Sequence, residues 1–93
     1  MAVPLSLDGW KIRSNDAFDD AITEWSGFGW YGRNLDALWD VLTGIVDPPI
    51  EICWSNAQLS KDAMGTSFDQ IVVVMREAEA ELGSEQFRLR IDL

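Results

Sequence analysis

The sequence predicts one small α/β domain, residues 1–93, in which strands alternate with helices. Three short apolar segments, at residues 3–7, 50–54 and 87–93, have the composition of strands. The connections between them are long and contain residues with helical periodicity. Because parallel strands need a crossover of a dozen or more residues, usually a helix, we expect a small parallel sheet with helices packed against it. The length of 93 residues allows one hydrophobic core.

The first strand is predicted at Val3–Leu7 and is followed by a turn at Asp8-Gly9. Capping residues at positions 14–16 open the first helix, which ends at Ser26-Gly27. The residues expected on its inner side are Phe18, Ile22 and Trp25.

The second helix is predicted from Asn34 to Thr43. Asn34 is a good N-cap, and the following apolar residues have the i, i+3, i+4, i+7 spacing of one buried stripe. These residues are Leu35, Leu38, Trp39 and Leu42. We expect Gly44 to be the C-cap of this helix.

The second half of the chain begins with a break at residues 47–49 and a strand at Ile50–Trp54. A short helix follows at Asn56–Ala63. Ser67 and Gln70 have capping-box spacing, so the last helix should run from there to Leu82 and end at Gly83. Its expected inward residues are Phe68, Ile71, Met75, Ala78 and Leu82. The last strand is predicted at Phe87–Leu93.

Composition excludes several classes of function. The formal net charge of −9 repels nucleic acids and anionic membranes and attracts basic proteins. No segment has the length and apolarity of a membrane span or the pattern of a signal peptide, so a cytoplasmic protein is expected. Cys53 is the only cysteine and lies in a predicted strand, where we expect it to be inert core packing. No metal and no cofactor is expected.

The acidic residues of the second helix indicate a partner. Asp36 and Asp40 are four residues apart, which places two like charges on one helix face at a cost of roughly 0.2–0.5 kcal/mol. Asp40 is also expected near the C-terminal end of the helix, where the dipole disfavours a carboxylate. The last helix repeats the pattern with Glu77 near its C-terminal half, and either Val73 or Val74 should be exposed beside it. Glu79 and Glu81 are interpreted as solvent-facing residues that maintain solubility.

Five tryptophans need an explanation in so short a chain. Trp10, Trp25 and Trp54 are expected to pack in the core. Trp30 differs, because it lies in a glycine-flanked loop just before the acidic helix, where a large ring can contact a partner.

An enzyme is not expected, because the chain has no histidine, no phosphate loop and no nucleophile-elbow motif. The remaining catalytic hypothesis is an acid–base pair of carboxylates drawn from Asp36, Asp40 and Glu77. A metal site built from the same carboxylates has no further support in the sequence.

The segment Tyr31-Gly32-x-Asn34-Leu35-Asp36-Ala37-Leu38-Trp39-Asp40-x-Leu42-Thr43-Gly44 resembles the central signature of the barstar family, intracellular inhibitors of secreted barnase-type ribonucleases. The likeness continues in Ile12-Arg13-Ser14, in Arg76-Glu77-Ala78 and in the order of elements over nearly the whole chain. It implies a three-stranded parallel sheet with three main helices and one short helix, a 1:1 complex with a basic ribonuclease, and no catalysis.

The resemblance also implies roles for individual residues. Asp40 would occupy a substrate-phosphate position in the enzyme, and Asp36 and Glu77 would each meet a further basic group. The other residues implied or expected at the contact are Trp30, Asn34, Leu35, Trp39, Gly44, Ile45 and Val74. Trp30 stands where barstar has a tyrosine. The chain departs from the family pattern at Ile45, where barstar has a tryptophan, and in the loop before Trp30, which aligns only with a one-residue gap. The alternative is therefore an acidic binding module for a different basic protein, such as a toxin or a regulator.

Overall fold

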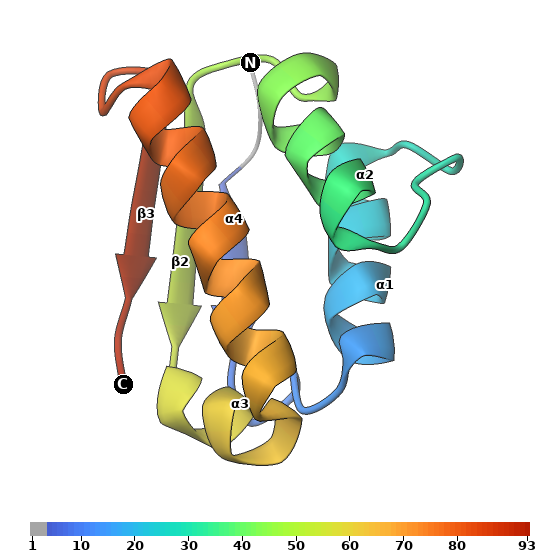
Figure 1. Ribbon diagram of the computed structural model, residues 1–93, viewed down its shortest axis with the longest axis vertical. Helices are drawn as coiled ribbons and strands as arrows, with labels where there is room; N and C mark the ends of the chain where they lie inside the picture. The colour runs from blue at the N-terminus through green and yellow to red at the C-terminus, as the bar shows by residue number, and fades with distance from the viewer. Residues whose placement is uncertain (1–3) are drawn as a thin grey trace.

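The chain forms a three-stranded parallel sheet with helices in both crossover connections (Figure 1). The computed structural model describes residues 4–93. The elements are β1 (Leu5–Asp8), α1 (Asn15–Ser26), α2 (Leu35–Asp40), η1 (Val41–Ile45), β2 (Ile50–Ser55), α3 (Ala57–Met64), α4 (Thr66–Leu82) and β3 (Phe87–Ile91). The element η1 is a π-helical turn that continues α2. The strand order is β1-β2-β3 and both pairs are parallel, which confirms the predicted fold class.

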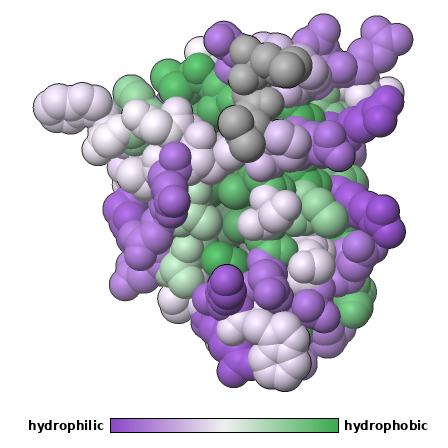
Figure 2. Space-filling model, turned by 180° about the vertical axis from the view of Figure 1, so that it is seen from behind, coloured by the Kyte–Doolittle hydropathy of each residue, from purple (hydrophilic) through white to green (hydrophobic). Residues whose placement is uncertain are grey.

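One face of the sheet is buried and the other is largely polar. Inward residues such as Leu7 and Ile52 are almost completely buried, whereas the alternate residues Ser6 and Arg88 are exposed. Figure 1 shows α4 in front of the sheet, with α1 and α2 beside it. Seen from behind, the surface is a mixture of polar side chains and a smaller apolar area (Figure 2). This one-sided arrangement follows when consecutive right-handed crossovers run in the same direction across a sheet.

The core is centred on the ring of Trp54 at the end of β2. Trp54 stacks on Phe18 with ring centroids 5.6 Å apart and meets Phe68 edge-on at 4.9 Å. Its indole Nε1 donates a hydrogen bond to Ser60 Oγ at 3.0 Å, and Ser60 Oγ donates in turn to the carbonyl of Ile12. Ser60 is completely buried, so this short chain of hydrogen bonds joins α3 to the segment that precedes α1.

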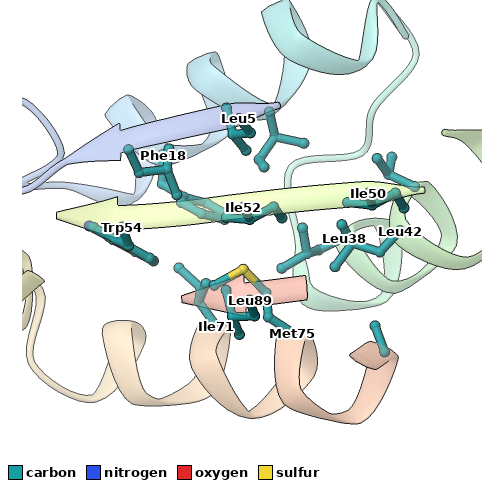
Figure 3. Close-up of a cluster of buried hydrophobic side chains, with 14 of the residues drawn as sticks. Leu5, Phe18, Leu38, Leu42, Ile50, Ile52, Trp54, Ile71, Met75 and Leu89 are labelled. Atoms are coloured by element: carbon teal, nitrogen blue, oxygen red, sulfur yellow. The ribbon is translucent and has the colours of Figure 1, made fainter. Parts of the chain in front are cut away.

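The predicted inner side of α4 is largely confirmed. Ile71 and Met75 point toward Ile52 and Leu89 of the sheet (Figure 3). Phe68 and Ala78 are also buried, whereas Leu82 is only partly buried. Gly83 is the C-cap, as predicted.

The turn after β1 requires glycine because the backbone of Asn56 lies against it. The Gly9 N–H donates to the Ser55 carbonyl at 2.8 Å, and a Cβ atom at Gly9 would lie 1.7 Å from the carbonyl oxygen of Asn56. The predicted turn at Asp8-Gly9 is thus confirmed, and it ties the ends of β1 and β2 together.

Two core predictions were wrong. Trp10 is 64% exposed, with the Arg13 guanidinium 5.4 Å from its ring centroid. Cys53 is only partly buried, because it alternates with the inward residues Ile52 and Trp54 of β2. Trp25 does pack against the core, as predicted. The predicted strand residue Val3 lies outside the described residues.

Two predictions for α4 also need correction. The helix begins at Thr66 after Gly65 without a side-chain cap, and Ser67 Oγ instead accepts a hydrogen bond from Asn15 at 3.4 Å, so no capping box forms. Glu79 is not simply a solvated residue. Its carboxylate pairs with Arg76 at 3.2 Å and accepts the Leu89 N–H at 3.1 Å, which occupies the free edge of β3.

Candidate functional site

The candidate site is the loop–helix segment, defined as residues 27–45. Its loop projects away from the body of the molecule between α1 and α2 (Figure 1). Gly27 ends α1 in the left-handed conformation, with φ of 67°. At the other end of the loop, Asn34 Oδ1 accepts the Ala37 N–H at 2.8 Å, which confirms Asn34 as the N-cap of α2.

The helix of this segment extends further than predicted. Gly44 is not a C-cap, because the π-helical turn η1 carries the helix through Ile45. The Val46 N–H donates to the Val41 carbonyl at 3.0 Å, five residues back. Asp40 is therefore inside the helical segment and not in its last turn, so the expected penalty from the helix end does not apply to it. The like-charge spacing from Asp36 remains.

The inner side of the helix fixes it to the core. Leu38, Val41 and Leu42 are almost completely buried, and Leu38 and Leu42 lie in the cluster that includes Ile50 of β2 (Figure 3). Leu35 and Trp39 of the predicted stripe are only partly buried. Val41 is not part of the predicted stripe, but it follows Leu38 by three residues and is buried on the same side of the helix.

The outer side carries exposed carboxylates and apolar groups. Asp36 and Asp40 are both exposed, and among residues 4–93 neither is part of a salt bridge. Trp30 is 88% exposed and Ile45 is 44% exposed. Gly44 faces solvent, and a Cβ atom there would have no neighbour within 4 Å.

The neighbouring helix α4 packs against α2 and η1 and adds to this surface. Glu77 is exposed, and the salt bridges found among the described residues do not include it. Val74 is partly buried against the core, whereas Val73 is 54% exposed, which confirms that one of the two valines reaches the surface. Asp36, Asp40 and Glu77 thus lie on adjacent helices, and none of the three is in a salt bridge with another of residues 4–93.

The loop is attached to α1 by two side chains that sequence reasoning missed. Tyr31 Oη donates a buried hydrogen bond to Asp19 Oδ1 at 2.9 Å. Arg33 Nη1 lies 2.9 Å from Asp20 Oδ1, and its Nη2 lies 3.5 Å from Asp16 Oδ1. A signal was present in the sequence, because Asp16 and Asp20 have the same unfavourable i, i+4 spacing as the pair on α2.

These attachments shift the titration of the groups involved. Burial raises the pKa of Asp19 above its ordinary value, although the Tyr31 hydrogen bond and Arg33 oppose this. Burial and the bond to Asp19 raise the pKa of Tyr31, which is neutral at physiological pH. The hydrogen bond to Asp20 raises the pKa of Arg33. A cavity of about 90 Å³ beside the loop is lined by Asp19, Tyr31 and Arg33 among others, but not by Asp36 or Asp40.

The chemistry of this surface is acidic and offers no enclosed carboxylate pair. Its carboxylates are solvent-facing, and no group of three metal-ligating side chains within residues 4–93 could hold a metal ion. The helix fixed to the core carries exposed carboxylates, and the loop before it carries the exposed ring of Trp30, a combination suited to contact with a basic protein. None of the helices in the described part of the chain is long and apolar enough to cross a bilayer.

The family follows from comparison with known proteins. Residues 2–93 match the family model described as barstar (barnase inhibitor), and the chain belongs to this family of ribonuclease inhibitors. A Bacillus subtilis (strain 168) protein named "Putative ribonuclease inhibitor YrdF" is 36% identical over 87 residues, which cover 92% of this chain and 94% of that protein. Barstar-family inhibitors are not enzymes, so the carboxylate-hydrolase hypothesis is wrong.

Proposed function

We propose that the loop–helix segment plugs the basic active site of a secreted guanyl-type microbial ribonuclease, with Asp40 in the position of a substrate phosphate. The observation that carries the proposal is the exposed Asp36/Asp40 pair, which has no cation among residues 4–93. A ribonuclease active site supplies the missing cations, because it must bind an RNA phosphate.

Asp40 is the centre of the proposed contact for an electrostatic reason. A carboxylate that loses its water on binding is favourable only when cations and hydrogen-bond donors replace that water. Several arginines around a phosphate site meet this condition. The acidic surface also attracts the basic enzyme before contact, and barnase and barstar are themselves a reference example of such steering.

The remaining proposed contacts surround Asp40. Trp30 offers a large exposed ring, Ile45 offers exposed apolar surface at the end of η1, and Glu77 meets a further cation from α4. The other residues in the proposed contact are Asn34, Leu35, Asp36, Trp39, Gly44 and Val74. Gly44 has no side chain, so the backbone of the enzyme can approach η1 closely there.

The proposed setting is the cytoplasm of a cell that secretes the ribonuclease. There the inhibitor forms a 1:1 complex with enzyme that has not yet been exported. The family description as a barnase inhibitor supports this setting.

The test is titration of a barnase-type ribonuclease with the wild-type chain and with Asp40→Ala, measuring RNA cleavage at low and moderate salt. We expect stoichiometric inhibition, and a loss of about 3–5 kcal/mol of binding free energy in the variant. The matched control is Glu51→Ala, which removes one negative charge from the exposed, outer side of β2. Equal weakening by Asp40→Ala and Glu51→Ala would leave only a general charge effect and refute the plug mechanism.

A second candidate is a basic partner other than a ribonuclease, favoured by the exposed Trp30 and Ile45, which differ from the residues of barstar at those positions. If the wild-type chain inhibits neither a barnase-type enzyme nor a ribonuclease of its own organism, this candidate replaces the first. Affinity capture that returns only ribonucleases would exclude it.

A further inference from the structure

Arg33 carries a positive charge within the loop–helix segment that is proposed to bind a basic enzyme. It is the only basic residue between Gly27 and Ile45, and the face that follows it is acidic. A positive charge opposite a basic cleft weakens association through like-charge repulsion. Arg33 also has φ of 56°, a left-handed conformation that side chains other than glycine rarely adopt. The like-charge repulsion and the left-handed backbone conformation are both unfavourable, and contact with a basic partner explains neither of them.

The contacts of Arg33 point toward α1 and not toward a partner. Its guanidinium reaches the carboxylates of Asp20 and Asp16 at 2.9 Å and 3.5 Å, and Nη2 also donates to the Asp16 carbonyl at 3.3 Å. Asp16 and Asp20 are one helical turn apart on α1, so a single cation between them relieves their repulsion. The charge of Arg33 is thus matched within the chain.

Tyr31 attaches the same loop to the same helix. Its hydroxyl bonds Asp19, which lies between Asp16 and Asp20 on α1 and is 9% exposed. Within the loop, the Tyr31 N–H donates a backbone hydrogen bond to the Phe28 carbonyl at 3.1 Å. The side-chain bonds to α1 add the attachment that this local turn does not provide. Trp30, 88% exposed, is adjacent to Tyr31 and three residues from Arg33.

We infer that Tyr31 and Arg33 are positioning residues, which hold the loop against α1 so that Trp30 is already oriented when the partner arrives. The inference rests on the proposed function. Its energetic basis is the ordering cost of a flexible loop, which reduces affinity unless the loop is fixed beforehand. Neither side chain needs to touch the partner.

The substitution Arg33→Gln distinguishes a positioning role from a charge effect, because the two change the affinity for the ribonuclease in opposite directions. Removal of a cation from an acidic surface should strengthen binding to a basic ribonuclease. Loss of the attachment to α1 should weaken it, and we expect a Kd roughly three- to tenfold higher. The matched control Arg88→Gln removes the same charge from the exposed side of β3 and should leave binding unchanged or slightly tighter.

A double-mutant cycle assigns the effect to Trp30. We expect Tyr31→Phe and Arg33→Gln to weaken binding in the wild-type background but to change it little in the Trp30→Ala background. The same substitutions should be additive with Asp40→Ala, which lies on the helix. A general loss of structure would weaken binding equally in all backgrounds and would overturn the inference, as would tighter binding by Arg33→Gln.

A measurement on the free protein keeps this inference distinct from the proposed function. Amide hydrogen exchange of residues 28–34 should become faster in Tyr31→Phe and Arg33→Gln, while exchange in the strands stays unchanged. Unchanged loop exchange would refute the positioning role. If the wild-type chain inhibits no ribonuclease, the proposed function fails, and the exchange data still decide whether the loop is held by α1.

Discussion

The guanidinium Nη1 of Arg33 lies 2.9 Å from Oδ1 of Asp20, which joins the loop–helix segment to α1. This pair makes an internal comparison possible. Asp16 and Asp20 on α1 have the same spacing as Asp36 and Asp40 on α2, but only the α1 pair has a cation within residues 4–93. The repulsion between the two aspartates is thus compensated by Arg33 on α1, whereas no salt bridge among residues 4–93 compensates it on α2.

Removal of the Asp40 carboxylate should stabilise the free protein. Asp40→Ala relieves the repulsion from Asp36 and introduces a better helix former, so we expect the free energy of unfolding to rise by about 0.5–1 kcal/mol. Asp36→Ala should give a smaller gain, because Asp36 lies in the first turn, where the helix dipole favours a carboxylate. Urea denaturation measures both, and a clear destabilisation by Asp40→Ala would show that this carboxylate serves the fold.

Substitution of Gly44 by alanine should raise the stability of the free protein and weaken its binding to the ribonuclease. In Gly44→Ala the new methyl group meets no atom within 4 Å, and the helix gains about 0.5–1 kcal/mol of stability. Inhibition of a barnase-type ribonuclease should nevertheless weaken, because the methyl group intrudes where the enzyme approaches. Thermal unfolding and inhibition titration are the two measurements. Full inhibition by the stabilised variant would remove Gly44 from the proposed contact.

Ser60→Ala should destabilise the core. It leaves the Trp54 indole N–H and the Ile12 carbonyl without their partner in a fully buried place. We expect a loss of about 1–3 kcal/mol for each unsatisfied group. The exposed control Ser84→Ala should change the free energy of unfolding by less than about 0.5 kcal/mol. Equal effects of the two substitutions would mean that the buried hydrogen bonds contribute nothing.

Asp19 should make stability depend on pH. Burial raises its pKa above 3.8 in the folded chain, so the folded state binds the proton more readily than the unfolded state. The ionised carboxylate therefore costs stability above the folded pKa, and this cost disappears as the pH falls below 3.8. Asp19→Asn has no such cost, so its stability relative to wild type should increase as the pH rises through this window. A relative stability that decreased with pH would show that the pKa is lowered.

Much of the fold could be predicted because its signals are local. The Asn34 cap, the Gly27 and Gly83 helix ends and the buried side of α4 follow from capping chemistry and from a period of 3.6 residues. The alternation in β2 is also a local signal, but the prediction of Cys53 as a core residue did not follow it.

The errors arise where the three-dimensional surroundings of a residue differ from what its local pattern indicates. Trp10 is apolar enough for a core, but it follows the end of β1, where Arg13 and solvent surround it. Ser67 has the spacing of a capping box, yet Asn15 of α1 uses its hydroxyl. The π turn η1 carries the second helix through Ile45, past the expected end at Gly44.

The order of helices and strands, the acidic character of the candidate surface and the family signature can all be read from the amino-acid sequence. Each depends on residue type and short-range spacing, which are visible in the printed chain. Which aspartates are neutralised depends on the folded structure, because Arg33 and its partners Asp16 and Asp20 are separated along the chain and meet only when the loop folds onto α1. Coulomb energy depends on distance and burial, and the fold determines both.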